Sequence, residues 1–365
     1  MRAAVYRGPH QLVCAELPAP LPADSEVLLD VIAAGICGTD VRIYKGEHRA
    51  AQPGRVPGHE IVGRVVAAAG TLPDGLSAGD IVFVAPNLGC GACRWCGRGQ
   101  ENLCPQTGAL GITLDGGFAE QVAVPARAVA RGNLIRLAGA DAAGETWAHA
   151  VLAEPLACVL RGQAKVGIEP GDSVLVSGGG PVGLLHVALA KARGAGLVVC
   201  SEPSPIRRDA ALRAGATQVI DPTAASVTEV VADLTAGAGV DVVITAAPVH
   251  ALQAQALELA ATGGRVLYFG GLPKSRPSVE LDTNHLHYKE LTLVGTTASN
   301  VEDCRRAVDL ITTGVVDTTW MVSHRFDLTD VAAAIRLAQD PAALKVQVSG
   351  VLPPIGDSTE GGKTR

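Results

Sequence analysis

The chain has 365 residues, 48% of them hydrophobic and only 18% charged, which suits two domains or one large one and excludes a disordered protein. A formal net charge of -6, without a dense run of Lys and Arg, argues against nucleic acid or an anionic membrane surface as the main partner. No apolar run approaches the roughly 20 residues that span a bilayer, and the N-terminus lacks the apolar segment of a signal peptide, so we expect a cytoplasmic protein with no membrane partner.

The chain up to about residue 150 is expected to form an irregular β domain. This part is rich in Gly and Pro, and its helical periodicity is weak. Short apolar runs bounded by turn residues, such as Glu26–Val31 and Gly79–Val84, are typical of short strands.

Beyond Pro170 the pattern changes to strands that alternate with Ala- and Leu-rich helical segments. Such alternation predicts βαβ units, and the nearly all-apolar strands are typical of a parallel sheet covered by helices on both faces. The expected strands are Ser173–Ser177, Leu197–Ser201, Gln218–Ile220, Val240–Thr245, Arg265–Phe269, Leu291–Gly295 and Leu344–Val348. The expected helices are Val182–Arg193, Pro205–Ala214, Ser226–Ala236, Val249–Ala261, Val301–Thr313 and Leu328–Leu337.

A glycine-rich loop joins the first of these strands to its helix. Gly178, Gly180 and Gly183 occupy the glycine positions of G-x-G-x-x-G, where the first makes the turn, the second admits a pyrophosphate and the third permits close helix–strand packing. At the helix N-terminus, Pro181 has no backbone N–H, and Val182 and the residues after it would supply N–H groups to that anion. A glycine triplet alone also fits a plain strand–helix turn.

The position of Glu202 favours a dinucleotide-binding role for this loop. It directly follows the second expected strand, at the spacing where an acidic side chain binds the adenosine ribose hydroxyls. The same carboxylate would repel a 2′-phosphate, so NAD is favoured over NADP. Arg207, which we count among the cofactor-binding residues, and Arg208 follow closely and keep NADP open as the alternative.

Four of the nine cysteines are clustered. Cys90, Cys93, Cys96 and Cys104 have the spacing C-x2-C-x2-C-x7-C. In a chain expected in the cytoplasm, such a cluster is more typical of metal binding than of disulfides. Four thiolates complete a tetrahedral zinc site and leave no open position, so the cluster predicts a structural zinc, with an iron–sulfur cluster as the alternative.

Cys37, His59 and Glu60 form a second set of potential ligands. One thiolate, one imidazole and one carboxylate leave a zinc position vacant, as a catalytic zinc requires. Because the spacing between Cys37 and His59 is long, a buried free cysteine and an ordinary histidine remain the alternative.

Together these motifs resemble the zinc-dependent medium-chain dehydrogenases/reductases of the polyol (sorbitol/iditol) and threonine dehydrogenase type. The resemblance covers nearly the whole chain except its tail. The matching motifs occur in the family's order and are Gly35–Asp40, Gly58–Glu60, the four clustered cysteines, Glu154–Cys158 and Gly178–Gly183.

The resemblance implies an α/β fold with two domains. A GroES-like, β-rich catalytic domain is expected over residues 1–154, with a zinc lobe at about 87–106, and the chain returns to it over residues 297–352. A Rossmann NAD-binding domain with a doubly wound parallel sheet is expected over residues 155–296. Residues 353–365 are expected to be a disordered tail.

The resemblance also assigns roles to single residues. Cys37, His59 and, in the polyol branch, Glu60 match the ligands of the catalytic zinc. Glu154 matches a carboxylate that either ligates this zinc or holds its water, and Thr39 matches a hydroxyl that binds the substrate oxygen. Two zinc ions per chain, NAD and a homodimer or homotetramer are implied as well.

Two positions depart from the family pattern. Arg42 stands where many relatives carry a histidine that ends a proton relay, and an arginine stays protonated, so it cannot be that base. Proton release is then expected through water and Glu60 or Glu154, with His48 as a candidate substitute. The Arg-Tyr pair of polyol dehydrogenases is absent from the stretch Gly295–Ser299, which argues against sorbitol itself.

The sequence therefore predicts an NAD-dependent zinc alcohol dehydrogenase (EC 1.1.1.-). Its substrate would be a small secondary alcohol of the polyol, cyclitol or aminocyclitol type, which loses a hydride and becomes a ketone. One alternative is a threonine-type amino-alcohol dehydrogenase. Another is a nucleotide-binding or redox-sensing relative without turnover, against which the complete set Cys37, His59 and Glu60 argues.

Overall fold

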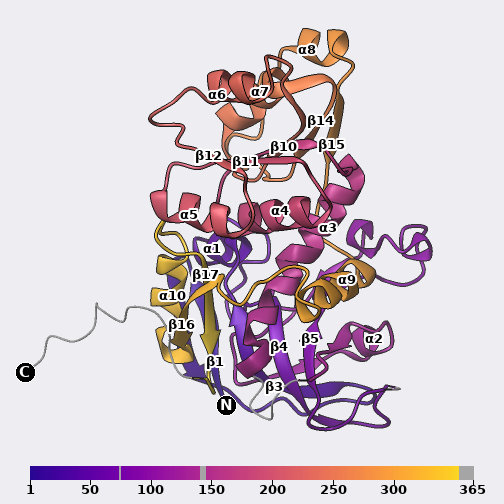
Figure 1. The fold of residues 1–365 in the computed structure, drawn as a ribbon. Coiled ribbons are helices and arrows are strands. Elements are labelled where there is room, and N and C mark those ends of the chain that lie inside the picture. The colour runs from indigo at the N-terminus through magenta and orange to yellow at the C-terminus, as the bar shows by residue number, and fades with distance from the viewer. Residues whose placement is uncertain (74, 140–144, 353–365) are drawn as a thin grey trace, which may run out of the picture. The chain divides into compact units, whose positions relative to one another are not determined.

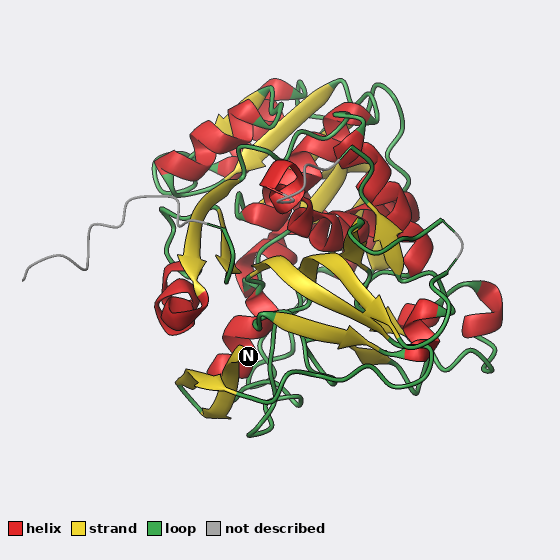
Figure 2. Ribbon diagram, turned by 90° about the horizontal axis from the view of Figure 1, so that it is seen from below, coloured by secondary structure: helices red, strands yellow, loops and turns green. Residues whose placement is uncertain are grey.

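The computed structural model describes residues 1–73, 75–139 and 145–352 of the chain. The chain divides into two compact units. Unit 1 comprises Met1–Glu154, Ser299–Gly314 and Thr318–Arg365, and unit 2 comprises Pro155–Ala298 and Val315–Asp317. Helices and strands both make up much of the chain (Figure 2), which confirms the predicted α/β class. The tail predicted at 353–365 lies outside the described residues.

Unit 2 is built on a sheet of six parallel strands, several of them labelled in Figure 1. They are β10 (Ser173–Ser177), β11 (Leu197–Ser201), β12 (Gln218–Ile220), β13 (Val240–Thr245), β14 (Ala260–Tyr268) and β15 (Thr292–Gly295). Their order is β12-β11-β10-β13-β14-β15, so the direction of winding reverses between β10 and β13. This is the doubly wound order of a Rossmann fold, and it confirms the predicted parallel sheet.

The helices of unit 2 begin where the sequence supplies capping residues. Ser204 Oγ accepts a hydrogen bond from the N–H of Arg207, and Ser226 Oγ accepts one from the N–H of Glu229, which satisfies donors that a helix start leaves free. Aliphatic side chains of the strands and helices form one buried core. The helices are α4 (Pro181–Ala192), α5 (Pro205–Arg213), α6 (Val227–Leu234), α7 (His250–Leu259) and α8 (Thr283–Tyr288).

The clearest boundary difference lies between α7 and β14. The helix was expected to run to Ala261 and the strand to begin at Arg265, whereas α7 ends at Leu259 and β14 begins at Ala260. Ala260 already pairs with Val240 of β13, ahead of a shift in register. The early start is therefore set by backbone pairing with the neighbouring strand, which the apolar pattern does not reveal.

Unit 1 contains a sheet formed by strands from both ends of the sequence. The strand order is β16-β17-β3-β4-β5-β9, and β8 pairs with β3. Near the end of the chain, β17 pairs antiparallel with β3, and Gln347 lies opposite Gly35. The strands are β3 (Val27–Gly35), β4 (Glu60–Ala68), β5 (Ile81–Val84), β8 (Gln121–Val124), β9 (Leu134–Arg136), β16 (Val322–Asp327) and β17 (Lys345–Ser349).

The remaining elements are short. The strand pairs are β1 (Arg2–Gly8) with β2 (Gln11–Glu16), and β6 (Asn87–Leu88) with β7 (Gly108–Ala109). The helices are α1 (Gly38–Tyr44), α2 (Ala126–Val129), α3 (Ala153–Val166), α9 (Val301–Thr312) and α10 (Val331–Leu337), and the 3-10 helices are η1 (Cys96–Arg98), η2 (Glu101–Leu103), η3 (Glu145–Leu152) and η4 (Leu328–Asp330). Within the described residues, no helix has the length and apolar character needed to cross a bilayer.

Candidate active site

The end of β3 and the start of β4 bring three predicted ligands together. Cys37 follows β3 and is the N-cap of α1, while His59 immediately precedes β4 and Glu60 is its first residue. The two strands run antiparallel, with Gly35 opposite Glu60. One ligand atom from each of Cys37, His59 and Glu60 therefore lies within 4.8 Å of the other two.

Two glycines leave room for this arrangement. A Cβ atom at Gly35 would overlap the carboxylate of Glu60. Gly58 has a φ of +96°, and a Cβ atom there would lie 2.6 Å from the ring of Phe118. Any larger side chain would move His59 or Glu60, which explains why glycine precedes each segment of the ligand group.

Asp40, in the first turn of α1, holds two of these groups in place. Its Oδ2 accepts a hydrogen bond from the N–H of Cys37 at 2.9 Å, and its Oδ1 lies 3.4 Å from Nδ1 of His59. Burial alone would lower the pKa of His59, but the charges of Asp40 and Cys37 raise this pKa well above its usual range. Asp40 is thus placed to orient the imidazole, as carboxylates do for many metal-binding histidines.

Lys345, the first residue of β17, forms a buried ion pair with Glu60 that sequence reasoning missed. Its Nζ donates to Oε1 of Glu60 at 2.6 Å and to the carbonyl of Ile36 at 2.9 Å, and it also contacts Oε2 of Glu60. Burial alone would lower the pKa of Lys345, but the Glu60 carboxylate raises it, so the ammonium stays charged. The two residues are 285 positions apart, and no local signal connects them.

The donors gathered here fit a zinc ion. A thiolate, an imidazole and a carboxylate are ordinary zinc ligands, and three of them leave a fourth position for a substrate. In the forms that bind a metal, a thiolate at Cys37 and a neutral His59 ring, the charges of Cys37 and of the buried carboxylates of Asp40 and Glu60 would exceed what Lys345 compensates. A divalent cation would neutralise that excess.

Glu154 lies close enough to act on this group through its charge. Burial, and to a smaller extent the charge of Glu154, raises the pKa of Glu60, and the Lys345 charge opposes this rise. Glu154 itself is only 7% exposed. Its carboxylate is not among the three ligand groups that lie within 4.8 Å of one another.

Thr39 and Arg42 interact on the more exposed side of α1. Nη2 of Arg42 donates a hydrogen bond to Oγ1 of Thr39 at 3.3 Å. His48, considered above as a proton acceptor, uses its Nδ1 to accept the N–H of Ala50 at 3.2 Å. That ring nitrogen is therefore engaged in the local turn.

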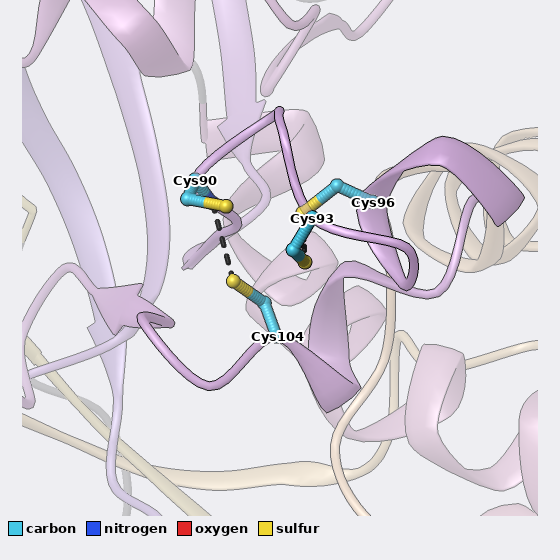
Figure 3. Close-up of side chains that lie close together, drawn as sticks. All are labelled: Cys90, Cys93, Cys96 and Cys104. Carbon is cyan, nitrogen blue, oxygen red and sulfur yellow. Dashed lines mark hydrogen bonds between the residues drawn. The ribbon is translucent and has the colours of Figure 1, made fainter.

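The four clustered cysteines point toward one another on a loop that η1 and η2 shape (Figure 3). The ligand atoms of Cys90, Cys93, Cys96 and Cys104 all lie within 4.8 Å of one another. The N–H of Cys90 donates to Sγ of Cys104 at 3.3 Å, and the sulfur atoms of Cys93 and Cys96 are 3.6 Å apart. All nine cysteines are free thiols, so this cluster fits a closed, four-thiolate structural zinc.

The loop also prepares thiolates for a metal. Hydrogen bonds from the backbone of Ala92 and Cys93 lower the pKa of Cys90 to about 6. A backbone hydrogen bond from Cys96 likewise lowers the pKa of Cys93, whereas burial raises the pKa of Cys96 to about 11. A thiol whose pKa is lowered releases its proton readily, and a zinc ligand must do so.

The glycine-rich loop of unit 2 meets three different constraints. Gly178 has a φ of +109°, which allows the sharp turn after β10. A Cβ atom at Gly183 would overlap the carbonyl oxygen of Gly178, whereas at Gly180 the nearest atom, Nη1 of Arg207, would be 4.0 Å away. The space at Gly180 is open to an approaching group, and α4 begins there with Pro181 and Val182.

Glu202, directly after β11, is fixed by the same loop. Its Oε2 accepts the N–H of Gly179 at 2.7 Å, and its Oε1 accepts the N–H of Ser204 at 2.9 Å. Each carboxylate oxygen can still accept another hydrogen bond. Arg208 pairs with Asp221 at 3.0 Å, so Arg207, next to Gly180, is the arginine that is better placed for a phosphate.

These features define a class of protein: an oxidoreductase with a dinucleotide-binding Rossmann unit and zinc-ligand sets in its other unit. Comparison with known families agrees. The family model "Alcohol dehydrogenase GroES-like domain" matches residues 23–133, and the family model "Zinc-binding dehydrogenase" matches residues 181–313. The chain belongs to the zinc-dependent medium-chain dehydrogenase/reductase family, as its motifs predict.

Individual relatives cover nearly the whole chain. L-threonine 3-dehydrogenase of Pyrococcus abyssi is 36% identical over 85% of this chain and 87% of the relative, and sorbitol dehydrogenase of Bacillus subtilis is 31% identical over 93% of each. A solved structure of a zinc-binding dehydrogenase from Sinorhizobium meliloti, bound to NADP, matches with a TM-score of 0.86 at 34% identity, covering 95% of this chain and 98% of that one. The two enzymes are named for different alcohols, and the solved structure contains NADP.

Proposed function

We propose that this chain is an NAD-dependent zinc alcohol dehydrogenase (EC 1.1.1.-) that oxidises a small secondary alcohol of the polyol, cyclitol or aminocyclitol type to a ketone. The observation that carries the proposal is the convergence of Cys37, His59 and Glu60, which offer a thiolate, an imidazole and a carboxylate within 4.8 Å of one another. A protein that only bound nucleotides would have no use for this second ligand set beside the four clustered cysteines.

The residues around the ligands each have a task in this reaction. When bound, zinc supplies a Lewis acid that stabilises negative charge on the alcohol oxygen, and NAD accepts the hydride from the carbinol carbon. Asp40 fixes the imidazole of His59, and Lys345 holds the carboxylate of Glu60. Thr39 hydrogen-bonds the substrate oxygen. Because Arg42 cannot take up a proton, the proton leaves through water toward Glu60 or Glu154.

The proposed cofactor is NAD, held by Gly178, Gly180, Pro181, Val182 and Gly183 around its pyrophosphate. Glu202 binds the ribose hydroxyls, and its charge disfavours a 2′-phosphate. The NADP in the Sinorhizobium meliloti structure makes the opposite preference the alternative, with Arg207 as the phosphate ligand. Michaelis constants for NAD and NADP in the wild type and in Glu202→Ala decide between them, because the variant should lose affinity for NAD and discriminate less against NADP.

A threonine-type amino-alcohol dehydrogenase is the second candidate function. It is favoured by the L-threonine 3-dehydrogenase relative and by the stretch Gly295–Ser299, which lacks the Arg-Tyr pair of polyol dehydrogenases. Both functions use the same ligands, so only the alcohol separates them. Reduction of NAD against a panel of polyols, cyclitols, aminocyclitols and amino acids would identify it.

We further propose that the protein is a cytoplasmic homodimer or homotetramer with two zinc ions per chain. One ion is bound by Cys37, His59 and Glu60, with Glu154 as a further ligand or water-holding group. The other is bound by the four clustered cysteines. Zinc analysis of the purified protein, with Cys37→Ala beside it, tests the metal sites. Two ions in the wild type and one in the variant are expected. The variant should bind NAD normally but transfer no hydride. Full turnover without the Cys37 thiol would refute a catalytic zinc.

A further inference from the structure

Arg42 is a charged side chain next to Thr39 to which the proposed reaction gives no task. It lies on α1, three residues after Thr39, and donates a hydrogen bond to the threonine hydroxyl at 3.3 Å. On the same helix, Asp40 and Ile43 are buried, while Arg42 is exposed. The helix therefore turns Asp40 toward the proposed metal ligands and carries Arg42 on its solvent-exposed side, within hydrogen-bond distance of the Thr39 hydroxyl.

The positive charge of Arg42 is not neutralised by the protein. Within the described ranges of the chain, no carboxylate lies within 4.0 Å of its guanidinium. Asp40, the nearest acid in the sequence, directs its two oxygens to the N–H of Cys37 and to the ring of His59. The guanidinium keeps most of its five N–H donors free for a ligand.

The contact with Thr39 also fixes what the threonine offers. A guanidinium only donates hydrogen bonds, so Thr39 Oγ1 accepts from Arg42 and its own hydroxyl proton remains available to another oxygen. A substrate oxygen held by Thr39 therefore lies within a short distance of an unpaired guanidinium. Planar carboxylates are the groups that such a guanidinium binds best, through two parallel hydrogen bonds.

We propose that Arg42 is a specificity-determining residue that binds a carboxylate of the substrate. The preferred substrates are then secondary alcohols with a carboxylate near the carbinol carbon, such as aldonates or β-hydroxy amino acids, rather than neutral polyols. This inference rests on the proposed dehydrogenase function and moves its substrate class from neutral polyols and cyclitols toward hydroxy acids, which include the substrate of the threonine-type candidate. A diphosphate of the cofactor offers a similar anion to Arg42, and the experiment separates the two sources.

The test compares pairs of substrates that differ in the carboxylate. Gluconate is paired with sorbitol, and L-threonine with 1-amino-2-propanol, at saturating NAD. The variants are Arg42→Gln, Arg42→Lys and, as a control that removes a nearby exposed charge of the same sign, Arg49→Gln. A readout that does not require oxidation of the carboxylate compound is the inhibition constant of butyrate, which has no hydroxyl group to oxidise.

We expect Arg42→Gln to lower kcat/KM for the acid of a productive pair by about 10- to 100-fold, the usual value of a charge-assisted pair. The partner without the carboxylate should lose less than about threefold in kcat/KM. Butyrate should inhibit the wild type and Arg49→Gln alike and bind more weakly to Arg42→Gln. Arg42→Lys should recover part of the loss because it keeps the charge.

Equal losses for the acid and its partner without the carboxylate, or wild-type activity confined to alcohols without a carboxylate, would overturn the inference and leave the dehydrogenase assignment standing. A rise confined to the KM for NAD would overturn it too, because Arg42 would then serve the cofactor phosphate. If the wild type binds zinc and NAD but oxidises none of these compounds or the wider alcohol panel, the proposed function itself fails.

Discussion

Lys345 and Glu60 are buried from water, with exposed fractions of 3% and 0%. The charge of each side chain is therefore stabilised mainly by the other. Replacing one member of a buried ion pair leaves the other charge uncompensated, which typically costs about 3–5 kcal/mol. We therefore expect Lys345→Met to lower the free energy of unfolding of the zinc-free protein by several kcal/mol, measured by urea denaturation.

Two control variants test whether the loss of stability in Lys345→Met comes from the uncompensated buried charge. Lys274→Met removes an exposed lysine and should change the stability of the protein by less than about 0.5 kcal/mol. The double variant Lys345→Met/Glu60→Gln removes both charges and should recover part of the loss. Equal stability of Lys345→Met and the wild type would show that the pair does not hold this part of the sheet together.

Because His186 is buried, we expect the free energy of unfolding to fall in mild acid. The imidazole is fully buried against Phe269, with its Nδ1 3.3 Å from the amide nitrogen of Gln163. Burial lowers its pKa to about 3, whereas an unfolded chain has a histidine pKa of about 6.5. Between these two pKa values His186 is protonated in the unfolded state but not in the folded state. The free energy of unfolding therefore falls as the pH drops below about 6.5.

The expected size of this effect is about 2 kcal/mol between pH 6.5 and pH 5, from about 1.4 kcal/mol per pH unit. Urea denaturation at pH 7, 6 and 5 measures it. His186→Gln should be less stable at pH 7 but should show a flatter dependence on pH in this range. Parallel pH profiles for the variant and the wild type would rule out His186 as the source.

At the scale of elements, substitutions at two glycines in the turn from β10 to α4 should distinguish effects on folding from effects on cofactor binding. A Cβ atom at Gly183 would overlap the Gly178 carbonyl, but one at Gly180 would meet no atom closer than 4.0 Å. Gly183→Ala should therefore lower both the melting temperature and NAD affinity. Gly180→Ala should keep the melting temperature and lose NAD affinity about 10-fold or more, because its methyl group fills the approach of the pyrophosphate. Calorimetry and NAD titration of both variants check this, and normal NAD binding by Gly180→Ala would count against the assignment.

The loop of clustered cysteines has little regular structure of its own, only the short helices η1 and η2. Its order should therefore depend on the metal. Cys96→Ser should lose one zinc ion per chain and expose the loop to proteolysis, because an incomplete thiolate set no longer closes the site. Cys14→Ser, outside the cluster, is the control. Unchanged zinc content in Cys96→Ser would refute the structural site.

Sequence patterns predicted the elements best among the strands of unit 2. The strands Ser173–Ser177, Leu197–Ser201, Gln218–Ile220 and Val240–Thr245 were expected with the bounds that the structure shows. The start of β14 was wrong because backbone pairing with β13 sets it. Capping serines and glycine turns are local signals, whereas strand pairing is not.

The candidate site divides in the same way. Cys37, His59 and Glu60 could be proposed as ligands because their residue types and flanking glycines form recognisable motifs, and the structure brings them within 4.8 Å of one another. Lys345 was missed because it reaches Glu60 only through the pairing of β17 with β3. The relation of Asp40 to His59 likewise depends on the pairing of β3 with β4, which no spacing in the sequence shows.

At the scale of the whole molecule, both proposed zinc-ligand sets belong to unit 1, and the glycine-rich loop belongs to unit 2. Removing zinc with a chelator should therefore speed amide hydrogen exchange around α1, β4 and the cysteine loop. Exchange in β10 to β13 should stay unchanged, and NAD should still bind. Mass spectrometry of exchange after chelation measures this. Equal loosening of the β10–β13 strands would show that the metal stabilises both units together.

The pairing of β17 with β3 has a consequence for how the protein is made. A ribosome releases the chain from its N-terminus, so Glu60 emerges 285 residues before Lys345, its counter-ion. Most of unit 2 is a continuous stretch, Pro155–Ala298, and its strands can pair during synthesis. The sheet of unit 1 can therefore gain β17, and Glu60 its counter-ion, only after the strands of unit 2 have been made.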